Sequence, residues 1–313
     1  MDIASVCLLG GTGFVGRAIA DRATARGIRV RVLTRSLPRA RSLTVLPTVE
    51  LMAGDPHDEK TLEAAFEGMD AAVNLIGILH EGRRQRFAEV HAELPRKVAQ
   101  ACRAGGVQHV VHVSALGASD KAPSRYLRSK AAGEAALRLA SSEVPWTVLR
   151  PSVVFGEDDR FLNLFADLVK LFPVVPLAGA QARFQPVWVE DVARCCVAAL
   201  GNPAAYGEAF DLCGPRVYTL EELVRFVAAT LGLDRAIVRL PAPLAQLQAF
   251  VLEHLPGKLM TRDNLRSMSV ASVCSGRPPD FCALEPSSIE AIVPAYMGPQ
   301  SIGARYARYR SER

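Results

Sequence analysis

The sequence predicts an α/β protein with a doubly wound parallel sheet, and three observations support this fold class. Half of the 313 residues are hydrophobic and 22% are charged, a composition typical of globular proteins. Over residues 1–150, short β-branched runs alternate with longer amphipathic segments, as in βαβ units. A glycine-rich turn separates the first predicted strand from the first predicted helix. Together these observations indicate a Rossmann-type sheet.

Six strands and the helices between them are expected in this half of the chain. The strands are predicted at residues 6–9, 28–33, 49–52, 71–76, 107–113 and 146–150. The helices are predicted at residues 14–26, 59–67, 87–104 and 126–140. Ligands of such a sheet lie beyond the carboxyl ends of its strands, so candidate site residues should follow the strands.

The turn after the first strand has the spacing of a phosphate-binding loop. It reads Gly10-Gly11-Thr12-Gly13-Phe14-Val15-Gly16. In this Gly-x-Gly-x-x-Gly pattern, the first glycine permits the tight turn and the second lets a pyrophosphate approach the backbone. The third lets the helix pack closely on the strand, and the helix N-terminus supplies N–H donors. We therefore expect these seven residues to bind a dinucleotide.

The end of the second strand distinguishes the two nicotinamide dinucleotides. An acidic residue there would bind the ribose 2′-hydroxyl of NAD, but this strand leads into Thr34 and Arg35, with Arg39 and Arg41 close behind. A guanidinium can pair with a 2′-phosphate, so NADP(H) is favoured and NAD(H) is the alternative. The arginines could instead form a solvated basic turn. Asp55, after the third strand, is expected to hydrogen-bond the adenine amino group or to cap the following helix.

Ser114, Tyr126 and Lys130 form a candidate catalytic set. Ser114 ends the fifth strand, and Tyr126 and Lys130 share one face of the next helix, from which both can reach the nicotinamide ribose. A nearby ammonium is expected to lower the pKa of the tyrosine toward the range useful for proton transfer. The serine would hydrogen-bond the substrate. The alternative is a Tyr-Lys pair on a solvated helix face.

After Pro151 the βαβ alternation stops. Prolines become frequent, and helices alternate with isolated strands such as the one at Glu208–Leu212. We expect residues 1–150 to form the NAD(P)-binding domain, with parts of 184–212 as candidates to complete it. Residues 151–313 are expected to form a smaller, interleaved substrate or partner lobe.

Charge and targeting signals exclude several functions. The net charge of +5 comes without a basic block or stripe, which argues against nucleic acid as a partner. The sequence has no signal peptide and no apolar run long enough to span a bilayer, so a cytoplasmic location is expected. No grouping of His, Cys, Asp or Glu has metal-ligand spacing, so no metal site is expected.

The seven cysteines form no C-x-x-C pair, and we assign them no function. Cys7, Cys102 and Cys213 lie in apolar stretches and are expected to be small buried hydrophobic residues. Cys195 and Cys196 are expected on a buried helix.

Further stretches carry a family resemblance. The glycine loop, Gly54-Asp55, Ser114, Tyr126-x-x-x-Lys130 and 150–156 (Arg-Pro-Ser-Val-Val-Phe-Gly) together resemble the extended short-chain dehydrogenases/reductases. The stretches 74–77 (Asn-Leu-Ile-Gly) and 184–192 (Phe-Gln-Pro-Val-Trp-Val-Glu-Asp-Val) resemble one atypical branch, which contains the NADPH-binding accessory subunit of mitochondrial respiratory complex I and its bacterial relatives. The resemblance implies tight NADP(H) binding with Asn74 in the nucleotide site, and a structural or redox-sensing role in the mitochondrial member.

Three functions fit these features. The favoured one is an NADP(H)-binding accessory protein with a respiratory-complex or quinone-linked membrane partner, peripheral at the inner face of the membrane. The second is an active NAD(P)-dependent reductase or a sugar-nucleotide epimerase or dehydratase that uses Ser114, Tyr126 and Lys130. The third is a redox sensor that changes partners with the NADPH/NADP ratio.

Two surface features bear on a partner. An apolar stripe at helical spacing is expected to pack on the second lobe, with docking on a partner or lipid as the alternative; it comprises Leu244, Leu247, Phe250, Val251 and Leu255. The basic, aromatic stretch 305–310 is expected to be a solvated terminus, with contact to anionic headgroups as the alternative.

Overall fold

The computed structural model describes residues 2–82, 85–141, 143–255, 259–275, 279–282 and 285–298; the stretch 305–310 therefore lies outside the described residues. The chain divides into two compact units. Unit 1 comprises Met1–Pro151, Val189–Leu212 and Ser275–Leu284. Unit 2 comprises Ser152–Trp188, Cys213–Cys274 and Glu285–Arg313.

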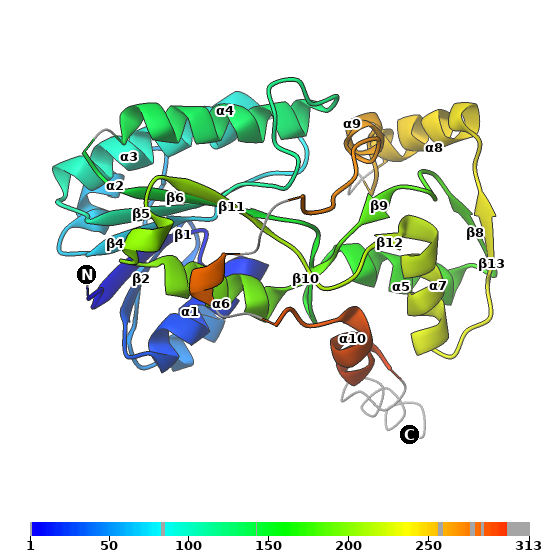
Figure 1. Ribbon diagram of the computed structural model, residues 1–313, viewed down its shortest axis with the longest axis horizontal. Coiled ribbons are helices and arrows are strands. Elements are labelled where there is room, and N and C mark those ends of the chain that lie inside the picture. The colour runs from blue at the N-terminus through cyan, green and yellow to red at the C-terminus, as the bar shows by residue number, and fades with distance from the viewer. Residues whose placement is uncertain are drawn as a thin grey trace. The chain divides into compact units, whose positions relative to one another are not determined.

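Unit 1 is built on a parallel sheet of seven strands in the order β11-β6-β5-β4-β1-β2-β3 (Figure 1). The strands are β1 (Ser5–Leu9), β2 (Arg29–Thr34), β3 (Val49–Ala53), β4 (Ala71–Asn74), β5 (His109–Val113), β6 (Trp146–Pro151) and β11 (Glu208–Leu212). The order runs outward from β1 in both directions, so the sheet is doubly wound and its switch point lies between β1 and β4. The predicted fold class is confirmed.

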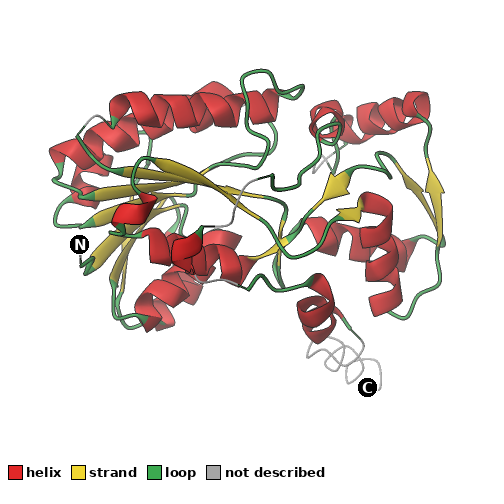
Figure 2. Cartoon of the chain, viewed as in Figure 1, coloured by secondary structure: helices red, strands yellow, loops and turns green. Residues whose placement is uncertain are grey.

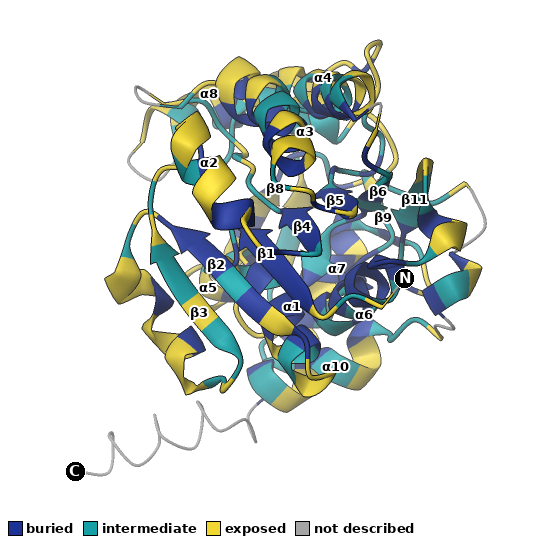
Figure 3. Cartoon of the chain, turned by 90° about the vertical axis from the view of Figure 1, so that its left-hand side faces the viewer, coloured by how far each residue is buried: buried dark blue, intermediate teal, exposed yellow. Residues whose placement is uncertain are grey.

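Helices cover both faces of this sheet (Figures 1 and 2). One face carries α1 (Phe14–Ala25) and α6 (Val189–Ala199), which pack against each other. The other carries α2 (Glu59–Phe66), α3 (Leu94–Ala104) and α4 (Arg125–Ala140). The central strand β1 is buried at every position, whereas the edge strand β3 has exposed residues (Figure 3). Short helices η1 (Leu37–Val45), η3 (Pro203–Ala205) and η4 (Asp280–Cys282) complete the unit.

Two expectations about the elements of unit 1 were wrong. The segment Glu208–Leu212 is not an isolated strand, because β11 pairs in parallel with β6 and makes the sheet seven-stranded rather than six-stranded. Its partner is about sixty residues away in the sequence, as in the pair Phe210 and Leu149, so no local pattern indicates the pairing. The segment expected as one helix over 87–104 contains a π-helical turn, η2 (Ala88–Glu93), before α3.

Unit 2 combines short strand pairs with helices. β7 (Val154–Phe155) pairs with β10 (Val187–Trp188), β8 (Val174–Leu177) with β13 (Ala236–Arg239), and β9 (Arg183–Phe184) with β12 (Tyr218–Thr219). Its helices are α5 (Phe161–Leu171), α7 (Leu220–Thr230), α8 (Ala242–His254), α9 (Arg262–Ser267) and α10 (Ile289–Met297). The core of this unit contains the fully buried Phe155, Leu162 and Leu223. Among the described residues, every helix is too short or too polar to cross a bilayer.

Two disulfides correct the expectation for the cysteines. Cys195 and Cys282 are joined within unit 1, and Cys213 and Cys274 within unit 2. The joined residues are 87 and 61 positions apart, so only the folded chain brings them together. Cys196 is buried on α6, and this burial raises the pKa of its thiol to about 12.

Candidate nucleotide-binding site

The turn between β1 and α1 has the backbone that a phosphate-binding loop requires. Gly10 has a positive φ of 86°, and the Gly13 N–H donates to the Gly10 carbonyl at 3.0 Å. A Cβ on Gly16 would lie 2.6 Å from Gly11 Cα and would overlap the Gly10 oxygen. Glycine at position 16 therefore lets α1 pack directly on the turn, as the motif requires.

The N-terminus of α1 is suited to an anion. Gly13 is the N-cap residue and supplies no side-chain acceptor, and the first turn contains no acidic residue. Thr12, Phe14 and Val15 are half-buried, and Gly13 itself is exposed. The first N–H groups of a helix lack intrahelical partners and carry a partial positive charge. A pyrophosphate placed at this turn would receive their hydrogen bonds.

Arg35 is the first residue after β2, at the position that decides between the two dinucleotides. Its side chain is exposed and makes no hydrogen bond or ion pair with any described residue. Arg39 and Arg41, on η1, are also exposed. The residues that directly follow β2 therefore present exposed positive charge.

Asp55 follows β3, and the structure decides between its two predicted roles only in part. The cap of α2 is Asp58, whose carboxylate accepts from the Thr61 N–H at 3.0 Å. Asp55 instead accepts from the His57 N–H at 3.1 Å and is exposed. The capping alternative for Asp55 was wrong because the helix begins three residues later than a cap at 55 would need. Its contact with adenine stays a prediction.

Three buried polar side chains at the ends of β4 and β5 have atoms without hydrogen-bond partners in the described chain. They are Asn74 Nδ2, Ser114 Oγ and both ring nitrogens of His112. Asn74 pairs with His112 across the two strands, and Ser114 lies two residues beyond His112, so all three share one face of the sheet. Buried polar groups are almost always satisfied, so these atoms indicate a polar ligand or water at this edge. A dinucleotide between this edge and the glycine turn fits them.

Helix α4 brings Tyr126 and Lys130 to the same edge. Ser124 caps the helix by accepting from the Leu127 N–H at 3.1 Å. Lys130 is buried, and its Nζ donates to the Val113 carbonyl at 2.8 Å, one residue before Ser114. Ser114 and Lys130 are thus held at the end of β5.

The pKa of Tyr126 beside Lys130 differs from the prediction. Burial raises the pKa of Tyr126 to about 12, so the expected lowering by Lys130 is wrong. Lys130 directs its ammonium at a backbone carbonyl, and desolvation of Tyr126 dominates. Burial lowers the pKa of Lys130 to about 8, and the nearby carboxylate of Glu134 opposes that shift.

His91 is a neighbour of the site that sequence reasoning missed. It is buried on η2, and its ring centroid lies 5.8 Å from that of Tyr126. Nothing in the sequence marks this residue, because its contacts come from segments thirteen and thirty-eight residues away. The described residues contain no cluster of three or more His, Cys, Asp or Glu side chains placed to hold a metal.

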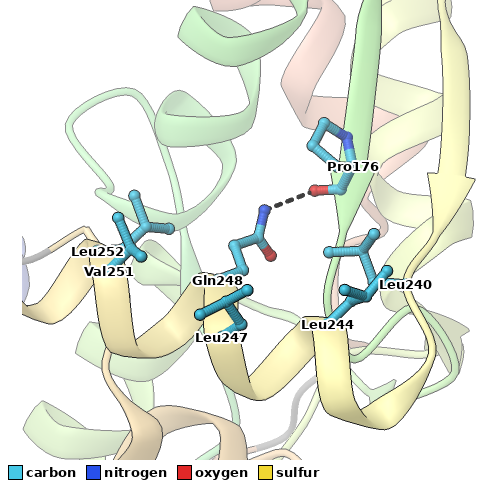
Figure 4. Close-up of a pocket in the computed structure, with 7 residues that line it drawn as sticks. All are labelled: Pro176, Leu240, Leu244, Leu247, Gln248, Val251 and Leu252. Carbon is cyan, nitrogen blue, oxygen red and sulfur yellow. Dashed lines mark hydrogen bonds between the residues drawn. The ribbon is translucent and has the colours of Figure 1, made fainter.

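The apolar stripe of unit 2 does not pack inward as expected. Its five side chains are about half exposed: Leu244 50%, Leu247 56%, Phe250 46%, Val251 50% and Leu255 47%. The buried face of α8 carries Ala245 and Ala249 instead, because the small residues allow close packing. An open groove of about 350 Å³ is lined by three residues of the stripe, Leu244, Leu247 and Val251 (Figure 4). Gln248 Nε2, which also lines this groove, donates to the Pro176 carbonyl at 2.9 Å.

Curated proteins of related sequence include respiratory subunits and a reductase. The chain is 35% identical to the Arabidopsis thaliana protein named NADH dehydrogenase [ubiquinone] 1 alpha subcomplex subunit 9, mitochondrial, over 80% of this chain and 64% of that protein. It is 33% identical to the Mus musculus protein of the same name, over 90% of this chain and 75% of that protein. A Caulobacter vibrioides protein named ceramide reductase is 30% identical over 76% of this chain and 74% of its own length. The chain therefore spans about two thirds to three quarters of these relatives.

Solved structures share the fold. Triphenylmethane reductase of Citrobacter sp., complexed with NADP(H), superposes with a TM-score of 0.72 at 18% identity, over 97% of this chain and 99% of that one. The NADPH-dependent quinone oxidoreductase QOR2 of Escherichia coli, complexed with NADPH, gives a TM-score of 0.73 at 17% identity, over 91% of this chain and 97% of that one. These likenesses confirm the Rossmann-type architecture.

A family model described as NAD(P)H-binding matches residues 10–203, which is more than half of the chain. The match begins at the glycine turn and includes Ser114, Tyr126 and Lys130. Together with the relatives above, it confirms the family resemblance seen in the sequence. The chain belongs to the NAD(P)H-binding family.

Proposed function

We propose that unit 1 binds NADP(H) in preference to NAD(H), with Arg35 pairing with the 2′-phosphate. The observation that carries this proposal is the exposed Arg35 immediately after β2, which has no partner among the residues that the structure describes. An acidic residue at this position would favour NAD. The glycine turn would hold the pyrophosphate, and Asn74, Ser114, Tyr126 and Lys130 would surround the nicotinamide half.

Replacing Arg35 by alanine tests this preference. Hydrogen bonds to charged groups contribute about 1.5–3 kcal/mol, so R35A should weaken NADPH binding by about 10- to 100-fold in calorimetric titrations. The affinity for NADH should stay within about twofold. R26A is the matched control, because Arg26 is an exposed arginine at the C-terminal end of α1, whereas the glycine turn lies at its N-terminal end. Equal effects of R35A on NADPH and NADH would refute the assignment.

We further propose that the nucleotide is a resident component of an accessory protein that docks on a respiratory or quinone-linked membrane complex. Two relatives carry the name of a NADH dehydrogenase [ubiquinone] subunit, which supports this role. The exposed apolar face of α8 supports it independently, because contiguous exposed apolar side chains are typical of interaction surfaces.

Co-sedimentation with membranes from the source cells tests the docking. Wild-type protein should remain with the membrane fraction at low salt, and L247E should move to the supernatant. L139E is the control, because Leu139 is 85% exposed on α4 of unit 1. Wild-type protein found wholly in the supernatant, or equal behaviour of the two variants, would contradict the proposal.

A second candidate function is an NADP(H)-dependent reductase acting on a carbonyl substrate. It is favoured by the placement of Ser114 and Lys130 together at the end of β5, beside the helix turn that carries Tyr126. The bound nicotinamide would supply the hydride. Tyr126, with a pKa of about 12, stays protonated at neutral pH and can donate a proton to the carbonyl oxygen, while the Ser114 hydroxyl orients that oxygen.

The variant Y126F separates the two functions. If the protein is a reductase, Y126F should lower NADPH oxidation by about 100-fold or more. The dissociation constant of NADPH should rise by less than about tenfold, because only one contact of the nicotinamide half is lost. If the protein is only an accessory protein, no carbonyl compound in a broad panel should cause it to oxidise NADPH. Substrate-dependent turnover that survives in Y126F would refute the assigned acid role.

A further inference from the structure

The loop after β4 and the helix α4 are joined through one buried side chain, that of His91. Its Nε2 lies 3.0 Å from the backbone N–H of Ile78, which donates to it. Its Nδ1 lies 2.7 Å from Ser129 Oγ. Ser129 stands between Tyr126 and Lys130 on α4, so His91 links two segments that are far apart in the sequence.

The hydrogen bonds fix which ring nitrogen carries the proton. Ser129 Oγ donates its own proton to the Tyr126 carbonyl at 2.6 Å, so it accepts from His91. His91 therefore donates from Nδ1 and accepts at Nε2, which makes it a neutral imidazole with one defined tautomer. Burial, with a smaller contribution from Lys130, lowers the pKa of His91 to about 3, so this state holds at neutral pH.

Packing around the ring holds the same parts together. The ring stacks on Phe87 with centroids 5.3 Å apart and meets the edge of Tyr126 at 5.8 Å. The loop passes close by, because a Cβ on Gly77 would lie 3.5 Å from His91 Nε2 and 3.7 Å from Lys130 Nζ. On the other side, the His91 carbonyl occupies the space that a Cβ on Gly133 of α4 would need.

We propose that His91 is a positioning residue for the nicotinamide half of the nucleotide site. It fixes the backbone of residues 77–78 against the turn of α4 that carries Tyr126 and Lys130, and so sets the width of the space between the ends of β4 and β5 and this helix. The proposal rests on the proposed nucleotide site. It predicts a defect confined to one half of the nucleotide, because the hydrogen bonds and ring contacts of His91 among the described residues go to Ile78, Ser129, Phe87 and Tyr126, and not to the glycine turn or Arg35.

The test compares the binding of two ligands by two variants, each of which lacks one buried histidine. The ligands are NADPH and 2′,5′-ADP, which keeps the adenosine half and lacks the nicotinamide. The variants are H91A and H109A. His109 is buried on β5 of the same unit and also has two hydrogen-bond partners, Thr147 Oγ1 at 2.9 Å and the Gly201 N–H at 3.3 Å. H109A therefore reports the effect of losing a buried, bonded histidine outside the site.

Calorimetric titration and thermal unfolding should give a distinct pattern for H91A. Loss of its two hydrogen bonds should weaken NADPH binding by about tenfold, with 2′,5′-ADP affinity within about twofold of wild type. H109A should lower the unfolding temperature and change neither affinity by more than about twofold. H91Q, which keeps one donor and one acceptor, should recover most of the NADPH affinity.

Several results would overturn the inference. H91A with wild-type NADPH affinity would show that the loop is placed without His91. Equal losses for both ligands would indicate a general structural role. If H91A does not fold, S129A is the second variant. It removes the acceptor of the Nδ1 proton, together with the bond from the Ser129 hydroxyl to the Tyr126 carbonyl, and must show the same selective loss of NADPH affinity. Wild-type protein that binds neither ligand would refute the proposed nucleotide site itself, a result separate from these.

Discussion

Replacing Gly16 by alanine tests the close approach of α1 to the β1–α1 turn. The new Cβ would lie 2.6 Å from Gly11 Cα and 2.8 Å from Gly11 C, whereas carbon atoms in contact prefer about 3.5–4.0 Å. Both neighbours are backbone atoms, so α1 or the turn must move by about 1 Å. Overpacking of this kind costs about 1–3 kcal/mol, and the higher helix propensity of alanine offsets at most about 1 kcal/mol of it.

We therefore expect G16A to lower the free energy of unfolding by about 1–2 kcal/mol and the unfolding temperature by a few degrees. Its effect on NADPH binding should be larger, about tenfold or more, because the displaced atoms are those that would cradle the pyrophosphate. Thermal unfolding and calorimetric titration on the same samples measure the two effects.

The matched control is G27A, at the other end of α1. Gly27 has a φ of 76°, and no atom lies within 4 Å of the position that a Cβ would take. G27A should therefore lower the free energy of unfolding by about 1–2 kcal/mol through backbone strain alone. G27A should keep the wild-type affinity for NADPH. The reasoning is refuted if G16A binds NADPH as tightly as wild type, or if G27A loses affinity to the same degree.

Two further predictions concern stability. Glu134 is buried and accepts from Arg150 Nε at 2.8 Å and Nη2 at 2.5 Å. E134Q should lower the free energy of unfolding in urea by about 2–3 kcal/mol, because it removes the hydrogen-bonded counter-charge of a partly buried guanidinium, which then keeps only its electrostatic interaction with Asp211. E143Q, in an exposed pair with Arg103, should have no measurable effect, and similar losses in both variants would contradict the role of burial. Burial lowers the pKa of His109 from 6.5 to about 4, so the unfolded chain binds more protons below pH 6.5 and stability falls as the pH drops from about 6.5 to about 4. Over this pH range, the free energy of unfolding of H109N should fall by less than that of wild type, with a difference of up to about 3 kcal/mol. H254Q, at an exposed position, should follow the wild type. Parallel curves of the free energy of unfolding against pH for H109N and wild type would contradict the lowered pKa of His109.

Much of unit 1 could be predicted from the sequence because its signals are local. The glycine turn, the strand before it and the helix after it are encoded within about twenty residues. Arg35 could be singled out because its position is counted from the end of one strand. Such features need no knowledge of distant contacts.

The features that were missed depend on contacts between distant segments. β11 joins the sheet only through β6, and each disulfide joins cysteines more than sixty positions apart. His91 acquires its role from Ile78 and Ser129. The apolar stripe of α8 follows the ordinary pattern of a buried face, and only the packing of Ala245 and Ala249 shows that the opposite face is the buried one.

The pKa of Tyr126 shows a different limit. The spacing of Tyr126 and Lys130 places both on one helix face, but it does not fix where the ammonium points. In the folded protein the Lys130 ammonium donates to the Val113 carbonyl, and burial of Tyr126 determines its pKa. Spacing alone therefore nominates the residues of the candidate set without giving their charge states.

The most direct test of the central claim is to identify the nucleotide that the protein carries. The full chain should be purified gently, without added nucleotide, and the bound ligand released and analysed by mass spectrometry. NADP or NADPH, at about one per chain, is the predicted result. NAD or NADH in its place would contradict the role of Arg35 and favour an enzyme that recycles its own NAD.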